Sequence, residues 1–363
     1  MKKILILVNH DVVIYNFRLE IVEKLIEQGY KVYISSPYGE RIDDLVKLGC
    51  TYIETNVSRH GTNIIEDFKL ILYYRKLMKQ IKPDAVLTFT IKPNIYGGIA
   101  SCMLNIPYIA NITGLGTAVE NEGVMQRISV MLYKIAFKKV NCVFFQNEEN
   151  QQFFIDKKIA LGRHKLIPGS GVNLERFSLL EYPSDETIRF VFISRIMKEK
   201  GIDQYLEAAK FIKEKYPNTE FHICGFSEED YEDILNELHN KGIIIYHGMV
   251  RNIQDILKTV HCTIHPTYYP EGMSNVLLES CASGRPIITT DRSGCREIVE
   301  DGINGFIVKQ KNSDNLIERV EEFIQLNLKE KKDMGLKARE KVKEEFDRKL
   351  VVNAYMLAIE RVR

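Results

Sequence analysis

The sequence predicts an α/β protein with two doubly wound, Rossmann-like parallel sheets, because three observations agree. The chain has 363 residues, which is enough for about two domains at roughly 100 to 200 residues each. Short apolar runs alternate with segments of helical period in both halves of the chain. A Pro-Gly-Ser-Gly turn at 168–171 separates the two series. Alternating strands and helices form parallel sheets, so we expect one sheet on each side of this turn.

The first half contains six predicted strands with helical segments between them. Each strand is a short apolar run, as expected where helices cover both faces of a sheet. Gly29 ends the first amphipathic helix, and the second strand begins directly after it. The strands are predicted at 4–8, 31–35, 52–54, 85–89, 108–112 and 142–146, and the helices at 17–28, 67–81, 94–104 and 125–139.

The second half contains five predicted strands and a helical tail. The strands are predicted at 190–193, 220–224, 243–246, 262–265 and 286–290, and the tail helices at 313–326, 329–345 and 349–361. We therefore expect an N-terminal domain over 1–175, a C-terminal domain over 176–345, and a last helix over 346–363 that packs back toward the N-terminal domain. Ligands bind such sheets beyond the carboxyl ends of the strands, so we expect the two domains to face each other across a cleft.

The composition excludes several classes of protein. Lys and Arg number 50 and Asp and Glu 49, so the net charge of +1 argues against a nucleic-acid partner. Residues 1–180 carry 23 basic and 17 acidic side chains and the rest 27 and 32, so the first half is basic and the second acidic. Seven scattered cysteines without a Cys-x-x-Cys pair favour a reducing cytoplasm. No apolar run approaches the roughly 18 residues of a membrane span, so we expect any membrane contact to be peripheral.

The densest group of chemically useful residues lies at 268–279. Pro270 and Gly272 place Glu271 in a loop, Ser274 is the predicted N-cap of a helix, and Glu279 lies more than one turn inside that helix. The N–H groups of the first helical turn favour an anion such as a diphosphate. The two carboxylates are suited to accept hydrogen bonds from sugar hydroxyls. The alternative is that both glutamates are ordinary solvated charges.

Two cations follow the first strand of the second half. Arg195 and Lys200 lie between that strand and the next helix, where side chains enter a ligand crevice. Fixed cations stabilise the negative charge that a leaving diphosphate accumulates. The chain contains no Asp-x-Asp pair, so we expect these cations to act without a metal ion, and we expect no cofactor. The alternative is that they are surface charges.

These motifs resemble the retaining glycosyltransferases of family 4, which have the two-domain GT-B fold, and the resemblance covers essentially the whole chain. Glu271 and Glu279 match the family's E-x7-E motif, Arg195 and Lys200 match its diphosphate-binding pair, and 171–177 matches its interdomain segment. The resemblance implies that Glu279 binds a ribose and that Glu271 binds the donor sugar near the reacting centre. It further implies that donor contacts come from Gly272, Met273, Ser274, Asn275 and Val276, and from the loops that contain Gly225, Met249 and Val250.

Other segments are similar to bacterial enzymes that extend undecaprenyl-diphosphate-linked sugars, including those that add N-acetylgalactosamine to lipid-linked diacetylbacillosamine. These segments are 15–18, 92–94, 113–116 and 293–297. The resemblance implies transfer of a hexose or N-acetylhexosamine from a UDP-sugar to a lipid-linked glycan in polysaccharide or glycoprotein glycan assembly. The alternatives are a nucleotide-sugar epimerase of GT-B architecture and a non-catalytic nucleotide-sugar-binding protein.

The first half contains the candidate acceptor site. Polar residues follow several of its predicted strands, and these are His10, Asn16, Arg18, Lys92, Thr113 and Gly114. Many family members have a His-Gly pair where this chain has Thr113 and Gly114. His10 contacts the acceptor or makes only a structural hydrogen bond, and Lys92 meets an acceptor phosphate or is only solvated.

Two basic amphipathic stretches favour an anionic membrane surface. Residues 59–92 and 125–139 interleave Lys and Arg with aromatic and aliphatic residues. We therefore expect a peripheral location on the inner face of the cytoplasmic membrane. The alternative is that their apolar faces only pack on the sheet.

Overall fold

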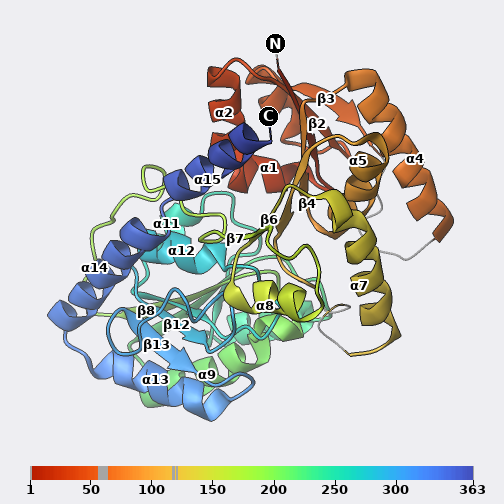
Figure 1. Cartoon of the computed structure of the whole chain (residues 1–363). Helices are drawn as coiled ribbons and strands as arrows, with labels where there is room; N and C mark the ends of the chain where they lie inside the picture. Colours follow the sequence, from red (N-terminus) through yellow and green to blue (C-terminus); the bar gives the residue numbers. More distant parts are fainter. Residues whose placement is uncertain (1, 56–63, 117–118, 120–121, 363) are drawn as a thin grey trace. The chain divides into compact units, whose positions relative to one another are not determined.

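The computed structural model describes residues 2–55, 64–116, 119 and 122–362, and it divides into two compact units (Figure 1). Unit 1 comprises Met1–Ser170 and Lys349–Arg363, and unit 2 comprises Gly171–Arg348. Arg59, at the start of the first basic stretch, lies outside the described residues. Each unit contains one parallel sheet covered by helices, so the predicted α/β class with two Rossmann-like sheets is confirmed.

Unit 1 has a parallel sheet of order β3-β2-β1-β4-β5-β6-β7. Its strands are β1 (Lys3–Leu7), β2 (Lys31–Ser36), β3 (Thr51–Glu54), β4 (Ala85–Phe89), β5 (Tyr108–Ile112), β6 (Cys142–Phe145) and β7 (His164–Leu166). Its helices are α1 (Asp11–Phe17), α2 (Leu19–Glu27), α3 (Ile42–Lys47), α4 (Ile64–Ile81), η1 (Pro93–Gly97), α5 (Gly98–Leu104), α7 (Val124–Ala136), η2 (Phe137–Lys139) and α8 (Glu148–Asp156).

The helices of unit 1 form a layer on each face of the sheet. One face packs against α1, α2, α3 and the last helix of the chain, α15 (Arg348–Arg361). The other face packs against α4, α5, α7 and α8, and Figure 1 shows α4, α5 and α7 on the same side of the unit. The continuously apolar strands are therefore buried from both sides.

The first predicted helix, at 17–28, is interrupted in the structure. Helix α1 already begins at Asp11, because the Nδ1 atom of His10 accepts a hydrogen bond from the backbone N–H of Val12. The backbone leaves the helical conformation at Arg18, and α2 begins at Leu19. The sequence prediction missed α1 because its hydrogen-bonding N-cap is a histidine, which is not among the common N-cap residues.

Helix α15 completes the core of unit 1. Tyr355 is buried, and its ring lies 4.6 Å from the ring of Phe144 and 6.0 Å from that of Phe89. The side-chain amide of Asn111 donates a hydrogen bond to the Tyr355 hydroxyl over 2.6 Å. The last helix therefore adds both apolar area and a buried polar contact to this unit.

Unit 2 has a parallel sheet of order β10-β9-β8-β11-β12-β13. Its strands are β8 (Ile188–Ile193), β9 (Thr219–Cys224), β10 (Ile245–Tyr246), β11 (Cys262–His265), β12 (Ile287–Thr290) and β13 (Gly305–Val308). Its helices are η3 (Lys198–Lys200), α9 (Ile202–Lys215), α10 (Glu232–Asn240), α11 (Ile253–Leu257), α12 (Asn275–Ala282), α13 (Ser313–Gln325) and α14 (Leu328–Glu345). The predicted tail of consecutive helices is confirmed, whereas β7 and β13 were not predicted.

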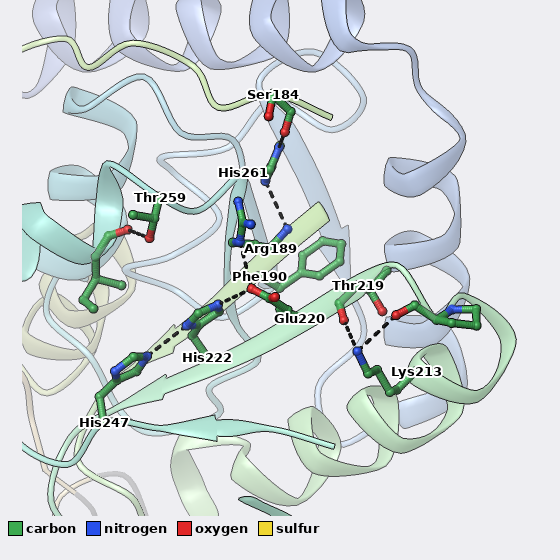
Figure 2. A network of polar contacts seen from close by, with 12 residues as sticks. Ser184, Arg189, Phe190, Lys213, Thr219, Glu220, His222, His247, Thr259 and His261 are labelled. Atoms are coloured by element: carbon green, nitrogen blue, oxygen red, sulfur yellow. Dashed lines mark hydrogen bonds and ion pairs between the residues drawn. The ribbon is translucent and has the colours of Figure 1, made fainter. Parts of the chain in front are cut away.

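A chain of polar contacts crosses the unit 2 sheet (Figure 2). Glu220 on β9 pairs with Arg189 on β8 over 2.8 Å and lies 3.3 Å from Nε2 of His222. His222 and His247 are stacked, with Nδ1 and Nε2 2.9 Å apart. The burial of His222 and its proximity to His247 lower its pKa. These contacts tie the β10–α11 loop to the middle of the sheet.

His261, directly before β11, is fully buried and makes two hydrogen bonds (Figure 2). Its Nδ1 atom accepts from the backbone N–H of Arg189 over 3.0 Å, and Nε2 lies 3.0 Å from the carbonyl oxygen of Ser184. The neutral ring satisfies both partners when Nε2 carries the proton. Burial lowers the pKa of His261 to about 4.

We predict that His261 makes the protein less stable in acid. The pKa of His261 is lower in the folded chain than in the unfolded chain, where it is about 6.5. The stability that the neutral ring contributes is therefore complete above pH 6.5 and is lost as the pH falls toward 4. The free energy of unfolding, measured with urea at pH 7 and at pH 4.5, should decrease between these pH values by about 2 kcal/mol less in His261→Asn than in the wild type. Equal losses in the two proteins would contradict this assignment.

Candidate functional site

The strand order of unit 2 reverses between β8 and β11, and the predicted site residues follow these two strands. β9 and β10 continue the sheet beyond β8, and β12 and β13 continue it beyond β11. Arg195 comes two residues after the end of β8, and the loop 266–274 comes directly after β11. In open parallel sheets, such a reversal forms a crevice at the carboxyl ends of the strands, where ligands bind.

Lys200 and Glu271 form an ion pair at this reversal. Gly201 makes the approach possible, because it has a φ of 80° and a Cβ atom there would collide with the carbonyl oxygen of Pro266. The backbone N–H of Tyr268 donates to the carbonyl oxygen of Glu199 over 2.9 Å. The turn that carries Lys200 is thus fixed against the loop that carries Glu271.

The ion pair is largely removed from water. The Lys200 side chain is 8% exposed and that of Glu271 18%. Burial raises the pKa of Glu271, but the charge and hydrogen bond of Lys200, together with the charge of Arg195, outweigh burial, and the pKa lies below its usual value. Glu271 is therefore an anion at neutral pH and remains one while Lys200 stays beside it.

Tyr269 lies beside both predicted cations. The Lys200 ammonium is 4.5 Å, and the Arg195 guanidinium 5.4 Å, from the centre of its ring. Arg195 also pairs with Glu228, which follows β9. Burial lowers the pKa of Arg195, but Glu228 and Tyr269 more than compensate and raise it above its usual value. The structure therefore brings Arg195, Lys200 and Glu271 together.

The segment 293–297, which follows β12, packs against the loop that contains Glu271. Gly294 has a φ of 88°, and a Cβ atom there would lie 2.7 Å from the carbonyl oxygen of Gly272. The backbone N–H of Ser274 donates to the carbonyl oxygen of Gly294 over 2.8 Å. The Glu297 carboxylate accepts from the Gly294 N–H over 2.7 Å and from the hydroxyl of Ser293 over 3.0 Å. The 293–297 segment thus has a structural role beside the candidate site.

Ser274 is the N-cap residue of α12, as predicted, but its hydroxyl makes no capping hydrogen bond. Asn275 and Val276 begin the helix and are partly buried, and Met273 is buried in the core of unit 2. The amino end of α12 therefore directly follows the loop that contains Glu271. A helix end of this kind favours an anionic ligand.

Glu279 lies in the second turn of α12, and its carboxyl group is unusual. Burial raises its pKa to about 7, and the charges of Arg176 and Arg348 offset the effect only in part. None of the hydrogen bonds found within the described part of the chain ends on its carboxyl oxygens. A partly buried carboxyl group of this kind gains most from a ligand that donates hydrogen bonds to it.

The loops after β8, β9 and β10 are held together through their backbones. Gly225 follows β9 with a φ of 150°, and a Cβ atom there would collide with the carbonyl oxygen of Ser194. The backbone N–H of Gly225 donates to the carbonyl oxygen of Gly248 over 2.8 Å. Met249 is 69% exposed and Val250 is partly buried. The structure thus brings Gly225 close to the segments that contain Arg195 and Met249.

His265 and Glu228 were not among the residues predicted from the sequence. His265 ends β11, is fully buried, and its Nε2 atom lies 4.0 Å from Glu271. Burial and Lys200 lower the pKa of His265 to about 4, so the ring is neutral at pH 7. A histidine at the carboxyl end of an apolar strand is a usable sequence signal for His265. Glu228 had no such signal, because its partner Arg195 is distant in the sequence.

The predicted acceptor residues of unit 1 follow β1, β4 and β5, which are neighbours in the sheet. Besides capping α1, His10 lies 2.8 Å from Asp11, so a structural role is shown for it. Lys92 pairs with Asp67 over 3.3 Å. Thr113 and Gly114 follow β5 and are partly buried.

Asn16 and Arg18 lie at the end of α1. Asn16 is partly buried, whereas Arg18 is 1% exposed. The Arg18 guanidinium donates to the carbonyl oxygen of Phe17 over 2.6 Å and lies 5.4 Å from the ring centre of Phe89. Arg18 is thus a buried cation of the unit 1 core, and its contact with an acceptor stays a prediction.

Both units match models of known protein families. Residues 3–147 match the family described as glycosyl transferase 4-like, and residues 177–341 match the glycosyl transferases group 1. Within the described ranges, no helix is both long and apolar enough to cross a membrane. In the same ranges, no three or more His, Cys, Asp or Glu side chains gather as metal ligands would.

Two curated relatives and one solved structure extend these matches. The chain is 27% identical, over 87% of its length and 89% of the relative's, to the N,N'-diacetylbacillosaminyl-diphospho-undecaprenol alpha-1,3-N-acetylgalactosaminyltransferase of Campylobacter jejuni. It is 26% identical, over 78% of its length and 76% of the relative's, to the UDP-Gal:alpha-D-GlcNAc-diphosphoundecaprenol alpha-1,3-galactosyltransferase of Escherichia coli. HepE of Anabaena, solved in complex with UDP, has the same fold, with a TM-score of 0.81, 16% identity, and coverage of 99% of this chain and all of that one.

We predict that Lys200→Met raises the pKa of Glu271, because the carboxylate then stays buried without its main counter-charge. A pH titration followed by NMR of carboxyl-labelled glutamate measures it. Lys198→Met, which removes an exposed charge from the same turn, is the control. An unchanged pKa of Glu271 in Lys200→Met would show that the ion pair does not hold the carboxylate ionised.

Proposed function

We propose that this chain, which belongs to the GT-B glycosyltransferases, transfers a sugar from a UDP-sugar to a lipid-diphosphate-linked glycan. Its glycosyl transferase 4-like segment is followed by a group 1 segment. The transferred sugar is a hexose or N-acetylhexosamine, its anomeric configuration is retained, and no metal ion takes part. The observation that carries the proposal is the convergence of Arg195, Lys200 and Glu271 at the strand-order reversal, with Glu279 in the second turn of the helix that follows the Glu271 loop.

The charges of the site support a diphosphate leaving group. Arg195 and Lys200 lie on the same tyrosine ring, so their charges are close together. In the proposed reaction, negative charge builds up on the diphosphate as the bond to the sugar breaks, and the two cations stabilise that charge. A front-face route, in which the leaving phosphate helps to deprotonate the acceptor hydroxyl, retains the configuration without a second carboxylate nucleophile.

The carboxyl groups support the sugar parts of the donor. Glu271 is an anion and accepts hydrogen bonds from hydroxyls of the transferred sugar in this scheme. Glu279, with its raised pKa, accepts hydrogen bonds from the ribose and is thereby relieved of part of its burial cost. The loop with Met249 and Val250 lies beside the base.

The relatives support the classes of donor and acceptor. Two curated relatives carry names that place undecaprenyl diphosphate on the acceptor, and one of these names a UDP-sugar donor. HepE was solved with UDP. We therefore propose that the acceptor glycan is linked to a polyprenyl diphosphate and meets unit 1 at the loops after β1, β4 and β5, where His10, Lys92 and Thr113 lie.

We predict that Glu271→Ala and Arg195→Ala each lower turnover by about 100- to 1,000-fold, the usual cost of removing one electrostatic contact to a transition state. The assay follows radiolabelled sugar from UDP-sugar into lipid-linked acceptor. Lys210→Ala with Glu214→Ala, two exposed positions on α9, is the control. Full turnover in both site variants would refute the site. Consumption of the UDP-sugar without acceptor would instead identify an epimerase.

We also propose that unit 1 binds the anionic inner face of the cytoplasmic membrane through α4 and α7. On α4, Ile65, Phe68 and Leu72 are exposed one turn apart. On α7, a stripe of exposed apolar residues runs along the helix, namely Val124, Ile128, Met131 and Ile135. Lysines and arginines flank both stripes, which is the pattern of a helix at a bilayer interface.

We predict that replacing Lys76, Lys79 and Lys82 by Gln weakens binding to anionic vesicles by at least tenfold. All three are exposed, and each basic residue near such a surface contributes about 1 kcal/mol. Vesicle sedimentation measures the effect, and UDP binding should not change, because these residues lie in unit 1. Vesicle binding equal to that of the wild type would leave these lysines as solvated surface charges.

A further inference from the structure

A basic hollow in unit 1 has no role in the proposed transfer. It lies between the end of α7 and the turn that joins α8 to β7, and its volume is about 350 Å³. Four cations line it, namely Lys134, Lys138, Lys158 and Arg163, and no carboxylate does. From this arrangement we infer that the hollow is a binding site for the phosphate of an anionic phospholipid. The inference deepens the proposed membrane contact and rests on it.

The four charges are not compensated within the described part of the chain. None of these side chains forms an ion pair there, whereas Lys92 in the same helix layer pairs with Asp67. Like charges that share a hollow repel one another, and a bound anion removes this repulsion. A phosphodiester adds charge-assisted hydrogen bonds to lysine and arginine.

The backbone conformation of the turn between α8 and β7 places part of these cations at the hollow. Lys158 and Ala160 have φ values of 55° and 49°, a left-handed conformation that is unfavourable for a residue with a side chain. Ile159 between them is buried and anchors the turn, and Nη1 of Arg163 donates to the carbonyl oxygen of Lys138 over 3.0 Å. The turn is thus held against the end of α7 by contacts that do not use the charge of Lys158.

Apolar residues beside the hollow favour a lipid over a free anion. Leu161 lines it and is 55% exposed, and Ile135, next to Lys134 in the sequence, is 50% exposed. Residues 124–139 of α7 and η2 contain no Asp or Glu. Cations next to exposed aliphatic side chains complement a phosphate joined to an acyl chain.

The hollow is separate from the candidate acceptor site. Lys138 precedes β6 and Arg163 precedes β7, so both lie at the amino edge of the sheet. The loops with His10, Lys92 and Thr113 follow β1, β4 and β5 at its carboxyl edge. The two edges are separated by the length of β1, β4 and β5, which have five residues each, or about 15 Å. The phosphate in the hollow therefore belongs to a surrounding lipid, not to the glycan acceptor.

The test compares vesicles of phosphatidylglycerol and phosphatidylcholine with vesicles of phosphatidylcholine alone. Lys138→Ala with Lys158→Ala should weaken binding to the anionic vesicles by about 30-fold, at about 1 kcal/mol for each charge. Lys24→Ala with Lys47→Ala, exposed positions on α2 and α3, should weaken it by less than about threefold, because their distance from the docking surface reduces their contribution. Lys138→Arg with Lys158→Arg should retain binding, which also controls for folding.

Several outcomes would overturn the inference. Equal losses in the two alanine pairs would show that only the overall charge matters. Saturable binding of inorganic phosphate to the wild type, without any preference for anionic vesicles, would identify a free-phosphate site. If the wild type and the variant Lys138→Ala with Lys158→Ala bind anionic vesicles equally well, the hollow is not a lipid site, whereas the proposed membrane contact of unit 1 is not contradicted. Binding of UDP by the same variants tests unit 2 separately.

Discussion

The ion pair between Lys200 and Glu271 is the interaction on which the candidate site depends. Two opposite charges that are nearly removed from water are stable only while each keeps a partner. A ligand that binds Lys200 must therefore bring its own negative charge, and it must also leave Glu271 with donors. A sugar linked to a diphosphate meets both conditions, because its phosphates are anions and its hydroxyls donate hydrogen bonds. The charges of this pair alone therefore favour a ligand that has both an anionic group and hydrogen-bond donors.

The sequence was sufficient for the parallel sheets and for the local structure around Glu271 and Glu279. Continuous apolar runs identified most strands, and the spacing of Glu271 and Glu279 around Pro270, Gly272 and Ser274 placed the loop and α12 correctly. β7 escaped prediction because its three residues contain two polar side chains at the edge of the sheet. Short edge strands have little periodicity for a sequence pattern to detect.

The sequence was not sufficient for the partners of the site residues. Glu228 reaches Arg195, and Lys92 reaches Asp67, only through the folded arrangement of loops and helices. The approach of Gly201 to Pro266 likewise depends on how two strands lie side by side, although each residue is visible in the sequence. Local patterns report which residues follow a strand, whereas tertiary packing decides which of them meet.

The membership of α15 in unit 1 has a consequence for how the protein is made. Unit 2 is one continuous segment, whereas unit 1 is assembled from both ends of the chain. Tyr355 and Ile359 belong to the unit 1 core, so this core stays incomplete until α15, which follows all of unit 2 in the chain, has been synthesised. Unit 2 has all its residues available earlier. The unit 1 core is therefore completed only after all of unit 2 has been synthesised, and until then Phe89 and Phe144 lack the aromatic ring that covers them.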